Sequence, residues 1–77
     1  MELETRILEI VKRYAKRDET PQPEESLFDS GLLDSFALPD MVTAIEKEFG
    51  VKIPDSDLNP RKFDSISRIE AYLQTRL

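Results

Sequence analysis

Asp34 and Ser35 are the residues of this chain whose types and spacing could support chemistry. They lie in the stretch "GLLDSF", which runs from Gly31 to Phe36. A serine hydroxyl beside an acid can be the point at which another group is covalently attached. Serine is also a preferred first residue of a helix, because its oxygen accepts a hydrogen bond from an unpaired backbone N–H. The stretch alone leaves two interpretations open, covalent attachment and a plain helix cap.

The composition argues against an enzyme. The chain has 77 residues, with no Cys and no His among them. Without cysteine there can be no disulfide, no thiolate metal site and no cysteine nucleophile. Without histidine the chain lacks the usual general base, the commonest metal ligand and any Ser-His-Asp triad. We therefore expect no catalytic residues.

A calcium motif is suggested by "DSDLN", from Asp55 to Asn59, where oxygen ligands occupy alternate positions. An EF-hand loop needs Gly at its sixth position and a bidentate Glu at its twelfth. This chain has Pro60 and Ile66 there. A helix cap at Asp55 explains the stretch, and we expect no metal site.

The charge balance limits the kinds of partner. The 16 acidic and 11 basic residues give a net charge of −5, whereas nucleic-acid binding requires a basic surface. A basic patch on a partner protein fits better, and its attraction would weaken as salt rises. The sequence has no long apolar run and no signal-peptide pattern at its start. We expect a monomer in the cytoplasm, without stable membrane insertion and without nucleic acid.

The spacing of apolar residues predicts an all-α fold for a single domain, residues 1–77. The expected helices cover residues 2–17, 35–49, 55–61 and a last segment that begins at 64 or 65. A long proline-containing loop joins the first two helices, and Gly50 is a C-terminal stop for the second. No β-alternation competes with this pattern. The sequence therefore predicts a small four-helix bundle with three main helices and one short third helix.

From Leu27 to Leu73 the sequence resembles the acyl carrier proteins, including their peptidyl- and D-alanyl-carrying relatives. The resemblance extends over nearly the whole chain and is most specific in "GLLDSF", "AIEKEFGVKIP" and "FDSISRIEAYL". In that family a serine carries a 4′-phosphopantetheine arm through a phosphodiester, and the thiol of the arm holds acyl or aminoacyl groups as thioesters. The resemblance assigns this role to Ser35, with Asp34 as the acid before it.

The resemblance also implies partners. A phosphopantetheinyl transferase would install the arm, an acyl or aminoacyl ligase or synthase would load it, and downstream transferases would take the cargo. Recognition in the family runs mainly through the second helix and the loop before it. Besides Asp34, this implicates Phe36, Ala37, Asp40, Thr43, Ala44 and Glu46. For the acids among them, simple solubility is the alternative role.

Three residues depart from the usual family pattern. Phe36 replaces the more usual Leu, as it also does in D-alanyl carriers with a similar "LLDSF" context. Pro39 lacks an N–H and disfavours helical geometry at Leu38, so we expect a distorted first turn between Ser35 and Leu38. Lys47 interrupts a face that is often continuously acidic in fatty-acid carriers. Together these differences suggest a carrier for a specialised pathway.

The leading hypothesis is therefore an acyl carrier protein with a 4′-phosphopantetheine arm at Ser35. A D-alanyl or peptidyl carrier is the alternative within the family. The rival from another class is an unmodified helical interaction module. The sequence leaves the cargo open, and we expect Met41, Ile45, Phe49 and Phe63 to form core rather than an acyl cavity.

Overall fold

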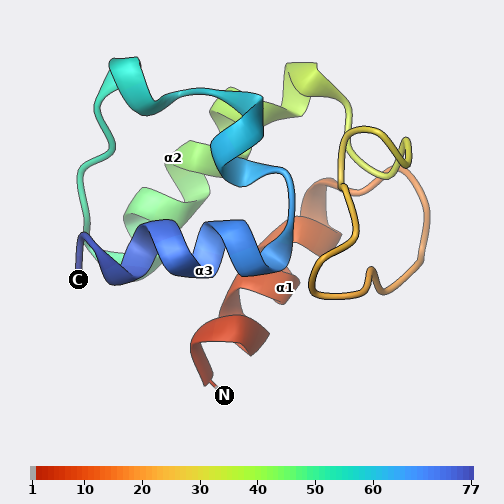
Figure 1. Cartoon of the computed structure of the whole chain (residues 1–77), viewed down its shortest axis with the longest axis horizontal. Coiled ribbons are helices and arrows are strands. Elements are labelled where there is room, and N and C mark those ends of the chain that lie inside the picture. Colours follow the sequence, from red (N-terminus) through yellow and green to blue (C-terminus); the bar gives the residue numbers. More distant parts are fainter. Residues whose placement is uncertain (1) are drawn as a thin grey trace.

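A computed structural model describes residues 2–77 of the chain. Within that range the α-helices are α1 (Glu2–Tyr14), α2 (Leu38–Phe49) and α3 (Ile66–Gln74). The shorter 3₁₀ elements are η1 (Ser35–Ala37), η2 (Asp55–Asp57) and η3 (Pro60–Phe63). Helix α1 packs against both α2 and α3, as Figure 1 shows. Every regular element of the described range is helical, which confirms the all-α class.

The apolar stripes of the helices meet in one core. Their spacing of three and four residues places these side chains on one face of each helix. The buried apolar residues of the helices are Ile7, Ile10 and Val11 from α1, Leu38, Met41, Val42 and Ile45 from α2, and Ile66, Ile69 and Leu73 from α3. Phe63 and Ile53 add to this core from the connecting segments. Of the four residues expected to be core, Phe49 is only partly buried, and the Arg6 guanidinium lies over its ring.

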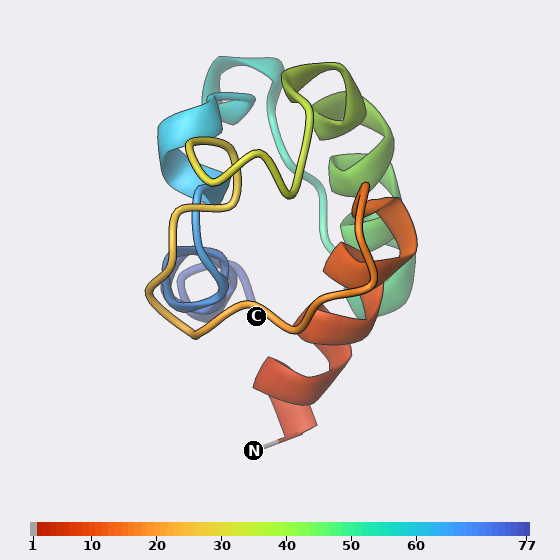
Figure 2. The ribbon, with the colours of Figure 1, turned by 90° about the vertical axis from the view of Figure 1, so that its right-hand side faces the viewer.

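The long loop between α1 and α2 is tied down by its own side chains. Leu27, Leu32 and Leu33 are buried in the core. The Asp64 carboxylate accepts a hydrogen bond from the Ser26 hydroxyl at 2.9 Å and from the Phe28 N–H at 3.2 Å. The loop therefore passes the start of α3 before it returns to α2, a path that can be followed in Figure 2.

Several helix bounds differ from those that the sequence predicts, since α2 begins at Leu38 rather than at residue 35 and α3 at Ile66 rather than at 64 or 65. Helix α1 ends at Tyr14 rather than near residue 17, because the backbone N–H of Lys16 donates to Leu32 in the loop. The expected third helix is two separate 3₁₀ turns, since Leu58 and Asn59 between them have non-helical dihedral angles.

The expected cap at Asp55 is wrong. Asp55 is the first residue of η2, and Pro54 before it provides no side-chain cap. Asn59 is the residue that caps, because its side chain accepts a 2.9 Å hydrogen bond from the Arg61 N–H at the start of η3. Gly50 ends α2 with φ +66°, as predicted.

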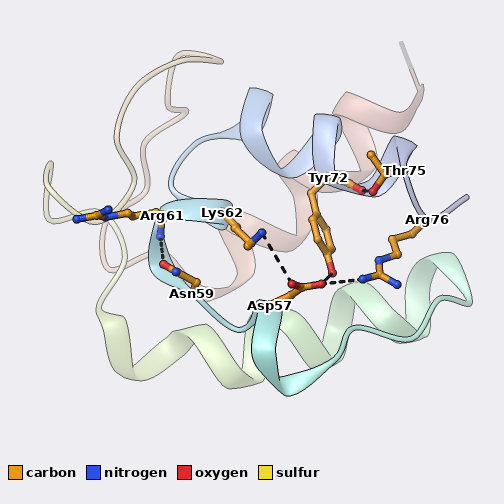
Figure 3. Close-up of polar contacts among 7 residues, drawn as sticks. All are labelled: Asp57, Asn59, Arg61, Lys62, Tyr72, Thr75 and Arg76. Carbon is orange, nitrogen blue, oxygen red and sulfur yellow. Dashed lines mark hydrogen bonds and ion pairs between the residues drawn. The ribbon is translucent and has the colours of Figure 1, made fainter.

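A polar cluster fastens the η2–η3 segment to α3 (Figure 3). The Tyr72 hydroxyl donates a 2.6 Å hydrogen bond to Asp57, whose carboxylate also pairs with Arg76 at 2.7 Å and with Lys62 at 3.8 Å. The hydrogen bond from Tyr72 is the main cause that lowers the pKa of Asp57. Burial and the same hydrogen bond raise the pKa of Tyr72. This cluster holds the connecting segment in place beside the helix that contains Tyr72.

The helices of residues 2–77 include none that is both long enough and apolar enough to cross a bilayer. The longest of them, α1, has 13 residues, and a transmembrane helix needs about 20.

Candidate functional site

Ser35 opens the short turn η1, which joins the loop to α2 near the top of Figure 1. Asp34 before it is extended and is the N-cap of this turn. The regular α-helix begins only at Leu38, with Pro39 as its second residue. The fixed φ of proline suits the first turn of a helix, and its missing N–H needs no partner there. The distorted first turn expected between Ser35 and Leu38 is confirmed.

The helix-cap interpretation of Ser35 is wrong. Asp34 supplies the cap, since its carboxylate accepts from the Phe36 N–H at 3.4 Å and its carbonyl accepts from the Ala37 N–H at 2.8 Å. The Ser35 side chain is exposed, and no group in residues 2–77 forms a hydrogen bond with its hydroxyl. Because capping does not use this hydroxyl, it is accessible to a modifying enzyme.

The chain contains other Asp-Ser pairs, and the structure separates them from Asp34-Ser35. The Ser30 hydroxyl bonds within its loop, donating to the Leu27 carbonyl and accepting from the Leu32 N–H, each at 3.3 Å. Ser65 is buried and caps α3 by accepting from the Arg68 N–H at 3.1 Å. Neither hydroxyl is as accessible as that of Ser35.

Ser56 comes nearest to Ser35 in its surroundings, because it is also exposed in a 3₁₀ turn after an aspartate. Its turn is not followed by an α-helix, since Leu58 leaves helical geometry at ψ 78°. Ser35 instead precedes α2, whose N-terminal end carries the positive end of the helix dipole and favours an added anion. Ser35 therefore combines exposure with a position suited to a phosphate.

Lys16 and Arg17, just after the end of α1, lie beside the loop that leads to Ser35. The Lys16 ammonium is 3.5 Å from the Asp34 carboxylate, and the Lys16 backbone N–H donates to the Leu32 carbonyl at 2.8 Å. Arg17 donates to the Ser30 carbonyl at 3.3 Å and pairs with Glu19 at 3.2 Å. From the sequence alone, these basic residues indicate only a solvated helix end. Their contacts depend on how the long loop folds back, and the sequence pattern does not show that path.

The residues predicted to bind partners are spread over two faces of α2. Asp40, Thr43 and Ala44 line a groove between α2 and α1, on the other side of which lie Arg13 and Tyr14. Phe36 projects from η1 with 88% of its side chain exposed, and Ala37 next to it is partly exposed. Phe36 therefore lies directly after Ser35 in η1, and Asp40 is exposed in the first turn of α2.

Glu46 faces the segment that follows α2. Its carboxylate accepts a 2.7 Å hydrogen bond from the Ile53 N–H, and it lines a second hollow with Pro39, Pro54 and Leu58. The sequence-based assignment of Glu46 to a partner surface overlooked this structural role. The bond forms because Val51, Lys52 and Ile53 follow the end of α2 without regular secondary structure, and the Val51 N–H donates to the Glu46 carbonyl at 3.3 Å.

The chain is similar to one protein family and to several known proteins. The model of a family described as "Phosphopantetheine attachment site" matches residues 5–73. The chain is 28% identical over 75 residues to the D-alanyl carrier proteins of Lactobacillus acidophilus and Lactobacillus helveticus, which covers 97% of this chain and 95% of each relative. It is 28% identical over 69 residues to a D-alanyl carrier protein of Streptococcus pyogenes, which covers 90% of this chain and 87% of that relative. The matched range contains Ser35, η1 and all of α2 and α3 up to Leu73.

Proposed function

Because the chain belongs to the phosphopantetheine-dependent carrier proteins, we propose that Ser35 is the residue to which its 4′-phosphopantetheine is attached. The observation that supports this most strongly is the state of the Ser35 hydroxyl. It is exposed, it has no hydrogen-bond partner within residues 2–77, and it lies just before α2. A free hydroxyl on an exposed turn is a suitable attachment point for an arm that must reach other enzymes.

The attachment reaction requires an enzyme partner. The Ser35 oxygen would form a bond to the phosphorus of the phosphopantetheinyl group of coenzyme A. The pyrophosphate P–O bond between that phosphorus and adenosine 3′,5′-bisphosphate would break, and the bisphosphate would leave. The serine proton must pass to a base. The chain has no histidine, so we assign that base to the phosphopantetheinyl transferase.

The attached arm supplies a thiol, on which acyl or aminoacyl groups are held as thioesters. The chain has no cysteine of its own for this purpose. Its residues instead bind and orient the partner enzymes, with Phe36 exposed next to Ser35 and Asp40 exposed in the first turn of α2. The proposed role of the protein is presentation rather than catalysis. We place this role in the cytoplasm, with a ligase that loads the arm and transferases that unload it.

D-alanine is the cargo that we propose to test first. The matched relatives are D-alanyl carrier proteins, and Phe36 follows the attachment serine here as it does in the "LLDSF" context of such carriers. Lys47, at the edge of the groove beside Asp40, also breaks up an acidic face. A mixed charge pattern of this kind supports a dedicated pathway rather than general fatty-acid synthesis.

Intact-protein mass spectrometry tests the proposed function. The purified chain is incubated with coenzyme A and a broad-specificity phosphopantetheinyl transferase, and its mass should increase by one phosphopantetheinyl group. The product is then incubated with ATP, a D-alanine-activating ligase and either D-alanine or L-alanine. A further gain with D-alanine alone supports the cargo. If the first mass gain does not occur while a known carrier is modified in parallel, the chain is an unmodified interaction module instead.

A further inference from the structure

Lys16 contacts Asp34, the residue that precedes the proposed attachment serine. Its ammonium lies 3.5 Å from the Asp34 carboxylate, and both side chains are about half exposed. Its backbone is fixed as well, because the Lys16 N–H donates to the Leu32 carbonyl at 2.8 Å. The long loop therefore brings Lys16, just after the end of α1, next to the residue that precedes Ser35.

The backbone donors of the turn already have partners. The N–H groups of Phe36 and Ala37 donate to Asp34, and the N–H of Leu38 donates to the Ser35 carbonyl. A phosphate on Ser35 would thus find few free N–H groups in η1, although phosphates at helix starts are commonly bound in that way. A nearby cationic side chain would therefore have to provide more of the stabilisation of that phosphate.

Two of the other cations near the end of α1 have partners of their own. Arg17 contacts Glu19 and the Ser30 carbonyl, and Lys12 donates to the Thr20 hydroxyl at 3.4 Å. Attachment at Ser35 would add a second negative charge beside Asp34, on a residue whose Cα is about 3.8 Å from that of Asp34. The two anions would repel each other within the Debye length of about 8 Å at physiological salt.

We propose that Lys16 is a positioning residue for the attached arm, and that its ammonium pairs with the phosphodiester on Ser35 while it remains beside Asp34. A lysine ammonium has three donors on a flexible stem and can serve two anions at once. It would anchor the base of the arm on the side of the turn that faces α1. This inference rests on the proposed attachment at Ser35.

Thermal unfolding of the apo and modified proteins tests the inference. Wild type, Lys16→Gln, Lys16→Arg and the control Lys12→Gln are each prepared in both forms, and intact mass verifies the modification. Circular dichroism then gives the Tm of each form at low salt and at about 1 M NaCl, where the Debye length is only about 3 Å.

We expect modification to change the Tm of wild type, Lys16→Arg and Lys12→Gln by less than about 1 °C. Modification should lower the Tm of Lys16→Gln by about 2–4 °C at low salt, as suits the loss of one exposed ion pair in a small domain. High salt should remove this difference. If Lys16→Gln shifts the apo and modified forms equally, Lys16 serves Asp34 alone and the inference is wrong. If wild type gains no mass, the proposed attachment itself is wrong.

Discussion

The carboxylate of Glu46 accepts a 2.7 Å hydrogen bond from the backbone N–H of Ile53. The bond connects the last turns of α2 to the segment after it, whose Ile53 side chain is buried in the core. Glu46 is itself partly buried. Glu46, which the sequence assigns to partner recognition, therefore has a structural role. Substitution can distinguish it from acids that have no such role.

Replacing Glu46 should destabilise the fold. We expect Glu46→Ala to lower the free energy of unfolding by about 1–2 kcal/mol, because a partly buried N–H loses a charged acceptor. The control Glu9→Ala removes an exposed glutamate from α1 and should change it by less than about 0.5 kcal/mol. Urea unfolding followed by circular dichroism measures both. Equal effects of the two substitutions would show that the bond to Ile53 contributes nothing.

Phe36 should matter for partners and not for stability. Its side chain is 88% exposed, so Phe36→Ala should leave the free energy of unfolding within about 0.5 kcal/mol of wild type. Loss of an aromatic anchor from an interface should lower kcat/KM for modification by the transferase about tenfold. Leu77, which is 65% exposed, provides the control Leu77→Ala, for which we expect no change in either quantity. An unchanged kcat/KM for Phe36→Ala would exclude Phe36 from transferase docking.

Stability should depend on pH through Asp57. The hydrogen bond from Tyr72 lowers the pKa of Asp57 below its ordinary value of 3.8. The contribution of Asp57 is therefore present above that value, and is lost as pH falls through the lowered pKa of the folded state. Wild type should have a higher Tm than Asp57→Asn near neutral pH, and the gap should close only as pH falls below 3.8 and through the lowered pKa of the folded state. Asp55→Asn alters an exposed acid of the same turn and should follow the wild-type curve. A gap between wild type and Asp57→Asn that is independent of pH would contradict this account.

The sequence predicts the three main helices well, because their stability comes from apolar stripes that are local patterns. Ile7, Ile10 and Val11 on α1 show such a stripe, and all three are buried. The short third helix is predicted less well. Its break at Leu58 and Asn59 reflects dihedral angles that depend on how the segment is held by Asp57 against α3.

The candidate site is only partly contained in the local sequence. Asp34 and Ser35 can be found from their motif, and Pro39 predicts the irregular turn. The motif does not reveal which of the two residues caps that turn, since serine and aspartate are both good caps. The contacts of Lys16 with Asp34 and of Glu46 with Ile53 depend on the path of the backbone between them, which no local pattern encodes.

Localisation of the phosphopantetheinyl group tests the central claim most directly. Wild type, Ser35→Ala and the matched control Ser56→Ala are incubated with coenzyme A and the transferase, digested and analysed by tandem mass spectrometry, after circular dichroism has shown that each variant is folded. We predict modification on Ser35 in wild type and in Ser56→Ala, and none in Ser35→Ala. A modified Ser35→Ala protein, or a fragment that carries the group on another serine, would contradict the account.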